Sequence, residues 1–476
     1  MSENAGTSSD KPVRSARNLS ARRIVGFACN QSFLFFLVYQ GVDGGALGGG
    51  GLQRLGLLAM LGSLVAGFAL VRLLGGQRVG GLFARPLLYV YAIVAAAGSL
   101  VGLFLPEGGV AGSVTQGVLV GLPCALLLTA WGRAFGRAPT ADSVPEIFIG
   151  SLVAALLCLL FSFAAASDLV LVATRILPLA SVVNIAVPGA GSGMGPQSAA
   201  GPEMLPAGKM RRLSVRMLLG TFFFGTACGL MDLYGADGFV GGSFYPVGLL
   251  LFGAYLLGCL SLLLSDGFGR GAALSKSYRL AVFVLLGGLL LMPISQLDAS
   301  GLLGQSFVLA GYLGLETVLI ALFVVMADLS ATDCAMAFSA GFLALFGGEF
   351  VGLLAAYGGM GLDAVGDTVP FFVAAAGLIS LLAYVFFFTE QDFDTLSQMV
   401  SGLDTLEHTC EQLTERYGLS ARESEILAFA LRGRTNERIA QELFIAKSTV
   451  DTHLRRIYAK CGVHSRQELL DLAEGR

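Results

Sequence analysis

The residues with the clearest chemistry lie near the end of the chain, between Lys447 and Lys460. Apolar residues recur there at helical spacing, so the segment predicts a helix with one buried face. The opposite face is short, polar and partly cationic, which suits a helix lying in the major groove of DNA. Ser448 and Asp451 form an S-x-x-D capping signal, which predicts that the helix begins near Ser448. The apolar positions are Val450, Leu454, Ile457 and Cys461, and the polar face holds Ser448, Asp451, Thr452, Arg455 and Ala459.

The flanking sequence predicts three more short helices. A capping box at Ser420 and Glu423 starts a helix of about twelve residues. Thr435 caps a second helix over residues 436–443, and a capping box at 465–468 starts the last one. Four short helices within about 55 residues make a compact unit, and its middle pair has the spacing of a helix-turn-helix.

Five short motifs distinguish this C-terminal unit. They are L-S-A-R-E-S-E-I-L at 419–427, G-R-T-N-E-R-I-A at 433–440, S-T-V-x-x-H at 448–453, I-Y-x-K at 457–460 and V-x-x-R at 463–466. Together they closely resemble the LuxR-type (LuxR/NarL/FixJ) DNA-binding domain, from about residue 418 to 472. The resemblance implies a transcription factor that binds inverted-repeat, double-stranded DNA as a homodimer, typically with its final helix in the dimer interface. RNA polymerase is a compatible further partner.

The resemblance also assigns roles to individual residues. Asp451, Thr452 and Arg455 would face the bases, on the side that helix geometry gives independently. One departure concerns Asp451, because many members of the family have lysine at this position. An acid repels phosphate, but it can cap the helix or accept a hydrogen bond from cytosine N4. Phosphate contacts would come from Thr435, Asn436, Lys447, Ser448, Thr449, Arg456 and Lys460, although Arg456 and Lys460 also fit plain surface charge.

Most of the remaining chain must lie in membrane lipid. Of the 476 residues, 55% are hydrophobic and only 13% are charged, whereas soluble domains are nearer a quarter charged. About twelve apolar segments are long enough to span a bilayer, which takes roughly 20 residues each. We therefore predict an all-α protein, a twelve-helix transmembrane bundle followed by the four-helix domain. The predicted spans are 24–42, 52–74, 86–105, 112–131, 147–166, 169–187, 213–234, 245–264, 279–297, 303–327, 335–357 and 369–388.

Basic residues mark alternate loops between the predicted spans. They follow the second, fourth and eighth spans and surround the start of the seventh, while the other loops are acidic, with Arg54 almost the only base. The loop after the tenth span breaks the pattern, because it contains Asp328 and Asp333 without a base, and we expect Asp328 to be solvated. The positive-inside rule counts lysine and arginine above acids, so both termini are predicted on the cytoplasmic side of a bacterial inner membrane.

The predicted spans fall into two groups of six. A Gly-, Pro- and Ser-rich segment separates the groups, and Asp266–Arg270 looks like a fragment of the D-x-x-G-R loop motif of major facilitator transporters. The arrangement resembles that superfamily. The predicted parts are a disordered tail at 1–20, a first half at 21–187, a cytoplasmic linker at 188–212, a second half at 213–388, an amphipathic connector at 389–417 and the DNA-binding domain at 418–476.

Six polar side chains inside the spans are candidates for a ligand pocket near the middle of the bilayer. Ionisable groups in lipid are costly and usually face a bundle interior or a cavity. Arg175 would meet an acidic group of a small molecule, and Glu316 or Glu349 would meet a donor or a cation. The alternative is an internal Arg–Glu pair, or hydrogen bonds that hold helices together. The six candidates are Asn30, Gln31, Arg175, Asn184, Glu316 and Glu349.

The connector, residues 389–417, is polar and acidic, with apolar residues in an uninterrupted 3-4 spacing. One interpretation is a two-stranded coiled coil that carries a dimerisation or twist signal from the membrane to the DNA-binding domain. The other is a single amphipathic helix packed on its own C-terminal domain. Gly402 weakens both, by about 1 kcal/mol of helix propensity. The apolar positions are Leu396, Met399, Leu403, Leu406, Cys410, Leu413 and Tyr417.

These features predict a membrane-embedded transcriptional regulator, in which the bundle senses a small molecule and controls DNA binding. The alternative is a secondary transporter with an appended DNA-binding domain. An enzyme has little support, because the sequence has no metal-ligand cluster, phosphate-binding loop, G-x-S-x-G elbow or H-E-x-x-H string. We predict no cofactor, no metal site and no catalytic residue.

Overall fold

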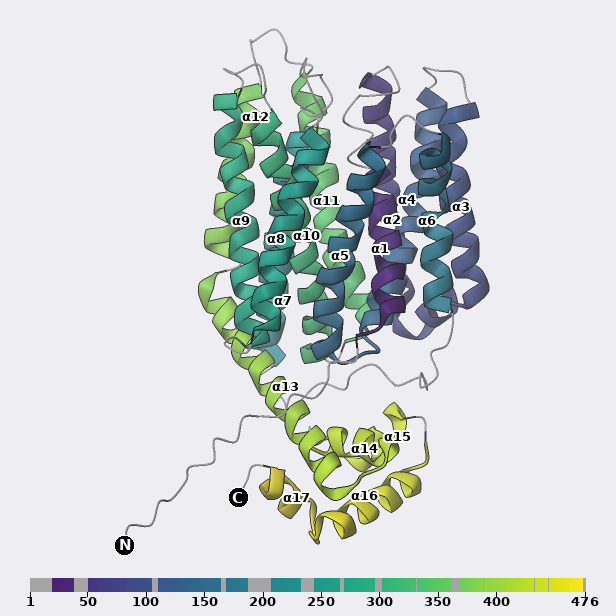
Figure 1. Ribbon diagram of the computed structural model, residues 1–476, viewed down its shortest axis with the longest axis vertical. Coiled ribbons are helices and arrows are strands. Elements are labelled where there is room, and N and C mark those ends of the chain that lie inside the picture. The colour runs from purple at the N-terminus through teal and green to yellow at the C-terminus, as the bar shows by residue number, and fades with distance from the viewer. Residues whose placement is uncertain are drawn as a thin grey trace, which may run out of the picture.

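The computed structural model consists of a large helical bundle and a smaller helical domain at one end of it (Figure 1). Every regular element in the part of the chain that it describes is a helix, which confirms the predicted all-α class. The structure describes residues 19–37, 50–104, 110–163, 168–186, 207–232, 244–265, 269–295, 302–330, 332–360, 369–387, 389–431, 433–443 and 445–473. Most of the predicted tail and most of the predicted linker lie outside these residues.

Each predicted span overlaps one of the bundle helices, although several helices begin or end well outside the predicted bounds. Within the described residues, nine of them are long and apolar enough to cross a membrane, and α3 and α6 contain shorter apolar stretches. The count of twelve membrane crossings therefore stays a prediction. The helices are α1 (Ala21–Phe35), α2 (Gly50–Leu82), α3 (Arg85–Phe104), α4 (Val110–Phe135), α5 (Thr140–Phe163), α6 (Asp168–Ala186), α7 (Ala207–Asp232), α8 (Phe244–Leu264), α9 (Arg270–Ser295), α10 (Leu302–Ser330), α11 (Cys334–Met360) and α12 (Val369–Leu382).

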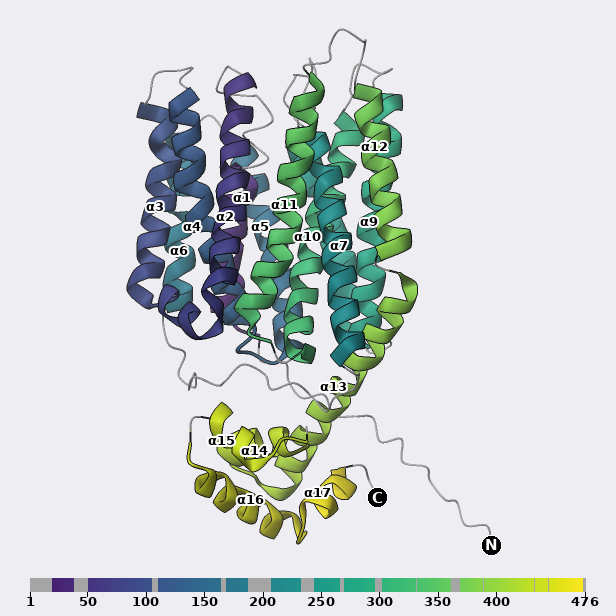
Figure 2. The ribbon, with the colours of Figure 1, turned by 180° about the vertical axis from the view of Figure 1, so that it is seen from behind.

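The packing of the bundle repeats after six helices. In the first half α1 packs against α5 and α6, α2 against α4, and α3 against α4 and α6. In the second half α7 packs against α11 and α12, α8 against α10, and α9 against α10 and α12. The halves meet where α2 contacts α11 and where α5 contacts α8, and each of these contacts is the counterpart of the other. The observed architecture is thus two related six-helix halves, as Figures 1 and 2 show from opposite sides.

Glycines let α7 and α11 approach until their backbones touch. A Cβ atom built on Gly225 would lie 2.0 Å from the carbonyl oxygen of Leu345, and one on Gly348 would lie 2.0 Å from that of Phe222. Helices in lipid gain little from burying apolar side chains against each other, so close backbone packing between small residues is what holds them together. The two helices therefore form one tightly joined pair.

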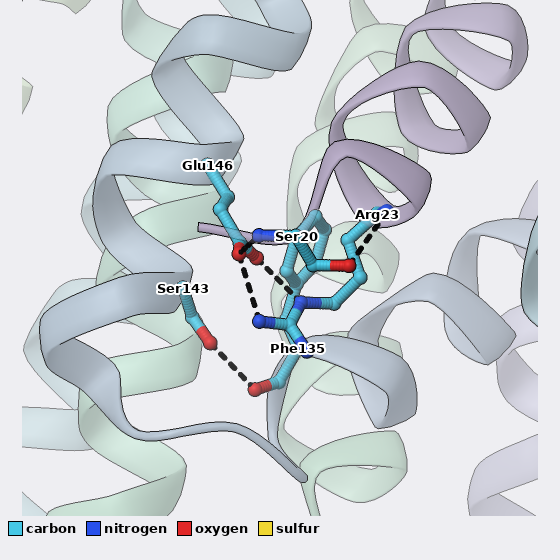
Figure 3. Close-up of polar contacts among 5 residues, drawn as sticks. All are labelled: Ser20, Arg23, Phe135, Ser143 and Glu146. Carbon is cyan, nitrogen blue, oxygen red and sulfur yellow. Dashed lines mark hydrogen bonds and ion pairs between the residues drawn. The ribbon is translucent and has the colours of Figure 1, made fainter. Parts of the chain in front are cut away.

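The beginning of α1 is fixed to the beginning of α5 by a buried carboxylate (Figure 3). Both oxygens of Glu146 accept hydrogen bonds from the Arg23 guanidinium, at 2.5 and 2.7 Å, and Oε1 also accepts from the backbone N–H of Ser20 at 2.6 Å. Ser20 is the N-cap of α1, and the Ser143 hydroxyl donates to the Phe135 carbonyl across the α4–α5 turn. Because the Glu146 carboxylate is fully buried, these partners are what make its charge tolerable there.

The loop predicted between the second and third spans is largely helical. Helix α2 runs on to Leu82, and its only non-helical backbone angles are at Gly75, where φ is 69°. A positive φ is tolerated at glycine because it lacks a Cβ atom. The predicted second span, 52–74, therefore ends at a kink inside a longer helix.

Helix α13 (Glu390–Tyr417) leads from the bundle into the smaller domain (Figure 2). A π-helix, η3 (Ala383–Phe387), precedes it. The domain consists of α14 (Ala421–Leu431), α15 (Asn436–Glu442), α16 (Lys447–Cys461) and α17 (Arg466–Ala473).

The apolar face of α13 is divided between two cores. Leu396 and Met399 are buried in the core of the bundle, whereas Cys410 and Leu413 are buried in the core of the C-terminal domain. A two-stranded coiled coil needs this face uncovered, so the dimerisation interpretation is wrong for the chain in this structure. The alternative of one amphipathic helix on its own domain is right for the second part, and the first part packs on the bundle.

We expect Gly348→Ala to destabilise the bundle by about 1–3 kcal/mol, because its methyl group would force α11 away from the α7 backbone. The neighbouring Gly347 is the matched control, since a Cβ atom there meets nothing within 4 Å. Thermal unfolding of both variants in the same detergent measures the difference. Equal stability would contradict the backbone contact.

Candidate DNA-binding interface

The C-terminal domain folds around the stripe of α16 that the sequence predicts. Val450, Leu454, Ile457 and Cys461 are the buried residues of that helix. They pack with apolar side chains of α14, α15 and α17 in a core of their own. The predicted stripe is confirmed.

One predicted capping box is formed in full and another in part. Ser420 N–H donates to Glu423 at 2.8 Å while Glu423 N–H donates to the Ser420 hydroxyl at 3.3 Å. At the last helix, Glu468 N–H donates to the Ser465 hydroxyl at 3.2 Å, but the Glu468 carboxylate accepts from the backbone N–H of His464, at 2.9 Å, where a capping box would use that of Ser465. These bonds satisfy backbone donors that a helix start leaves unpaired.

The recognition helix begins near Ser448, as predicted, but Ser448 is not its N-cap. Helix α16 begins at Lys447 after an N-cap residue, Ala446, which makes no side-chain capping bond. The Ala446 carbonyl instead accepts from the backbone N–H groups of Thr449 and Val450. Ser448 therefore lies in the first turn, with its hydroxyl group exposed on the outer side of the helix.

The polar face of α16 points away from the bundle. The helix lies on the far side of the domain in both views (Figures 1 and 2). Thr452, Arg455 and Arg456 are exposed, whereas Thr449 is half-buried. Thr435, just before α15, is exposed too. This face can approach DNA without obstruction from the bundle.

A hydrogen bond links the two helices of the helix-turn-helix. The Asn436 side-chain amide, at the start of α15, donates to Asp451 Oδ1 on α16 at 2.7 Å. Both residues are half-buried. Asp451 thus has a partner inside the domain, which accounts for an acid at this position better than contact with a base does.

Two predicted phosphate-binding lysines also have carboxylate partners in the free protein. Lys447 forms an exposed ion pair with Glu437 of α15. Lys460 donates to Glu423 at 2.7 Å and to the Gly418 carbonyl at 3.0 Å, so it fixes the end of α13 to α14. The phosphate contact of Lys460 stays a prediction, but in the free protein its ammonium group is already hydrogen-bonded to Glu423 and to the Gly418 carbonyl.

The contact with Lys460 sets the charge state of Glu423. The Lys460 ammonium and the Ser420 backbone N–H lower the pKa of the Glu423 carboxyl group to about 2. Glu423 is therefore ionised at neutral pH, and it stabilises the start of α14 as both a cap and an ion-pair partner.

In the bundle, the structure brings together only some of the ligand candidates. The Glu316 carboxyl group on α10 lies near the Gln31 amide on α1. Both side chains are buried, and neither amide atom of Gln31 has a well-formed hydrogen bond. The Asn30 amide nitrogen is also buried without a partner. Gln31 and Glu316 belong to different halves, so they bridge the interface between them.

The other candidates lie elsewhere. Arg175 and Asn184 are on α6, which packs on α1, α3 and α4 of its own half. Asn184 donates to the Ala180 carbonyl of the same helix at 2.9 Å. Glu349 accepts from the Tyr312 hydroxyl, between α11 and α10 of the second half. A pocket in which Arg175 lies together with Glu316 or Glu349 stays a prediction.

A small pocket lies between the α4–α5 turn and the α10–α11 turn, at the end of the bundle nearest the smaller domain. Thr140, Asp328 and Cys334 are among its lining residues. Asp328, which the sequence led us to expect in solvent, is buried there. The expectation is wrong because the two halves close over the end of α10.

A family model for "bacterial regulatory proteins, luxR family" matches residues 418–473, the same unit as α14–α17. Residues 418–473 form a LuxR-family helix-turn-helix domain. The predicted resemblance is confirmed, and this part of the chain is a DNA-binding domain of transcriptional regulators.

Curated relatives match this domain only in part of their length. YgeK of Escherichia coli (strain K12), an uncharacterized response regulatory protein, is 38% identical over 84 residues, which are 17% of this chain and 57% of YgeK. The HTH-type transcriptional regulator MalT of Vibrio campbellii is 38% identical over 63 residues, 13% of this chain and 7% of MalT. MalT of Yersinia pestis is 41% identical over 56 residues, 12% of this chain and 6% of MalT.

The bundle is similar to a solved transporter. The structure of the major facilitator proton:xylose symporter XylE bound to 6-bromo-6-deoxy-D-glucose aligns with a TM-score of 0.50 and 13% identity, over 76% of this chain and 92% of that chain. The likeness concerns the fold alone. The LuxR-family domain is thus joined to a membrane region with a major facilitator-like fold.

Sequence reasoning missed several residues that position the interface. Asn436 and Asp451 were assigned to DNA, and their mutual bond has no signal in the sequence, because the two residues are 15 positions apart on different helices. Arg422 donates to the Leu443 carbonyl at 3.2 Å and Arg466 to the Ala430 carbonyl at 2.9 Å, so both fix helix ends. Both arginines lie inside the family motifs quoted above, and this is the one feature of the sequence that could have indicated their importance.

We expect the stability that Glu423 contributes to be fully present above pH 4.5, the ordinary pKa of glutamate, and to be lost as the pH falls toward its folded value of about 2. Glu423→Gln should remove this pH dependence and cost about 1 kcal/mol at pH 7. Urea unfolding of residues 404–476, followed by circular dichroism between pH 7 and pH 3, measures it. Glu425→Gln, at an exposed position of the same helix, is the control.

We expect Asp451→Asn to bind DNA fragments more tightly than the unmodified chain, because asparagine can still accept from Asn436 while its neutral side chain no longer repels phosphate. Asp451→Ala should bind more weakly, by about 1 kcal/mol, because the link between α15 and α16 is lost. Filter binding at two salt concentrations tests both variants. A changed base preference in Asp451→Asn would favour direct reading of a base.

Proposed function

We propose that the protein is a membrane-embedded transcriptional regulator, in which the transmembrane bundle senses a small molecule and controls sequence-specific DNA binding by the C-terminal domain. The observation that carries this proposal is the course of α13. One continuous helix is buried in the core of the bundle at its beginning and in the core of the DNA-binding domain at its end. A displacement of its first turns is thus passed on to the domain as a whole.

The DNA-reading residues follow from the exposed face of α16. Arg455 pairs with guanine and Thr452 contacts a base edge, while Arg456 and Lys447 hold phosphates once Lys447 leaves Glu437. Ser448, Thr449 and the beginning of α15 at Thr435 and Asn436 add further phosphate contacts. Asp451 positions α16 and does not read a base.

Small-molecule sensing is proposed for the interface between the two halves, where Gln31 and Glu316 meet. An amide with two unpaired atoms beside a carboxyl group suits a ligand that both donates and accepts hydrogen bonds. A ligand between the halves changes their relative position. Both termini lie in the cytoplasm of a bacterial cell, and two copies of the chain bind the two halves of an inverted repeat.

The test is to recover genomic DNA fragments with the full-length protein in lipid nanodiscs. We expect one inverted repeat to be enriched, and Arg455→Ala to lower its affinity by about 1–3 kcal/mol, the usual value of a bidentate arginine–guanine contact. Arg416→Ala removes an exposed arginine from α13, outside the reading helix, and should leave the affinity unchanged. Enrichment that survives Arg455→Ala, or no enrichment at all, would contradict the proposal.

A second candidate is a secondary transporter to which the DNA-binding domain is appended. The likeness of the bundle to a symporter fold favours it. Uptake of candidate sugars and amines into proteoliposomes, with and without a proton gradient, distinguishes the two functions. Accumulation together with a lack of DNA enrichment would make the transporter the better explanation.

A further inference from the structure

The first turn of α13 is organised by one carboxylate. Asp392 Oδ2 accepts from both the backbone N–H and the hydroxyl group of Thr389, at 3.0 and 2.9 Å, and so completes a capping box. Its other oxygen, Oδ1, accepts from Arg216 Nη1 on α7 at 3.1 Å. The group that starts the connector helix is therefore also the group that ties it to the bundle.

Arg216 holds both sides of the bend between the bundle and the connector. While Nη1 donates to Asp392, Nη2 donates to the backbone carbonyl of Phe386 at 3.0 Å. Phe386 belongs to η3, the π-helix before the bend, and a π-helix often marks a functional position. The next residue, Phe387, stacks on Phe223 of α7 at a ring distance of 4.9 Å. Helix α7 thus contacts the chain immediately before and after the bend.

Helix α9 supplies the second support, an aromatic one. The buried ring of Tyr278 lies 4.7 Å from Phe393 of α13, 6.3 Å from Tyr384 of η3 and 6.1 Å from Phe224 of α7. Rings at these distances attract one another in addition to the apolar area they bury. Phe393 is followed by the buried residues Leu396, Met399 and Val400, which dock the next two turns against the bundle.

Each of these supports comes from α7, α9 or η3, which belong to the second half of the bundle. We propose that Arg216 is a positioning residue that fixes the connector to the second half, so that the DNA-binding domain moves as an extension of that half whenever the two halves shift. The inference rests on the proposed function, because it names the path by which sensing reaches the DNA-binding domain. The first half acts on the domain by displacing the second.

Hydrogen exchange measures the positioning role directly, in full-length protein in nanodiscs. We expect Arg216→Ala to raise the exchange of residues 390–400 about tenfold, the effect of losing a charged hydrogen bond, and to leave α14–α16 unchanged. Arg216→Lys should restore part of the protection, and Arg212→Ala, an exposed arginine of the same helix, should have no effect. Unchanged exchange at 390–400, or an equal rise in α14–α16, would overturn the inference.

A double-mutant cycle measures how strongly the interface between the two halves is coupled to DNA binding, and it needs no known ligand. Phe68 of α2 stacks on Phe342 and Phe346 of α11, across the interface between the halves, so Phe68→Leu disturbs their relative position. We expect Phe68→Leu to change the affinity for the enriched DNA fragment at least threefold when Arg216 is present, and to have no effect in Arg216→Ala. Phe68 and Arg216 lie on different helices, so their effects should be non-additive only if the connector that Arg216 fixes carries the disturbance to the DNA-binding domain. The same change in both backgrounds, or none in either, would overturn the proposed path.

The hydrogen-exchange experiment and the double-mutant cycle together distinguish a failure of this inference from a failure of the proposed function. If the unmodified chain enriches no DNA, the proposed function fails, and hydrogen exchange still decides whether Arg216 positions the connector. If Arg216→Ala yields no folded protein, Asp392→Asn replaces it, because asparagine keeps an oxygen for the Thr389 cap and loses the charge that Arg216 pairs with.

Discussion

The burial of one apolar helix face in two separate cores is the constraint on which the rest of the structure depends. The side chains from Phe393 to Val400 belong to the core of the bundle, and those from Cys410 onward belong to the core of the DNA-binding domain. Neither end of α13 can leave its place without exposing these side chains to water, at roughly 25 cal/mol for each Å². The membrane region and the domain are therefore joined by a packed helix, and a packed helix passes on rotation as well as displacement.

Ion pairs within the domain divide its basic residues into two groups. Lys460 is paired with Glu423 and Lys447 with Glu437, while Arg455 and Arg456 are exposed on α16, where they can contact DNA. DNA must compete with Glu437 for Lys447, which lowers the affinity of a single domain. The proposed binding of two domains to one inverted repeat would compensate for this, because the second contact becomes intramolecular.

The sequence predicts those features that a local pattern encodes. The spacing of hydrophobic residues predicted the bundle helices and the buried stripe of α16. Capping residues predicted where α14 and α17 begin. It fails where partners come from distant parts of the chain. The 3-4 spacing of the connector showed an apolar face without showing what covers it. In the sequence, Arg216 is one of the basic residues that predict the cytoplasmic side of the membrane. Its residue type alone does not show that it also forms an ion pair with Asp392.

The length of α13 has a geometric consequence for target search. Only five residues separate Val400, in the bundle core, from Leu406, which packs on the domain. At 1.5 Å per residue this is about 9 Å, so the DNA-binding domain is held close to the end of the bundle. Under the proposed function, a regulator tied to the membrane in this way would not diffuse to its operator. The chromosome would have to bring the operator to the membrane, and the position of the gene within the cell would become part of its regulation.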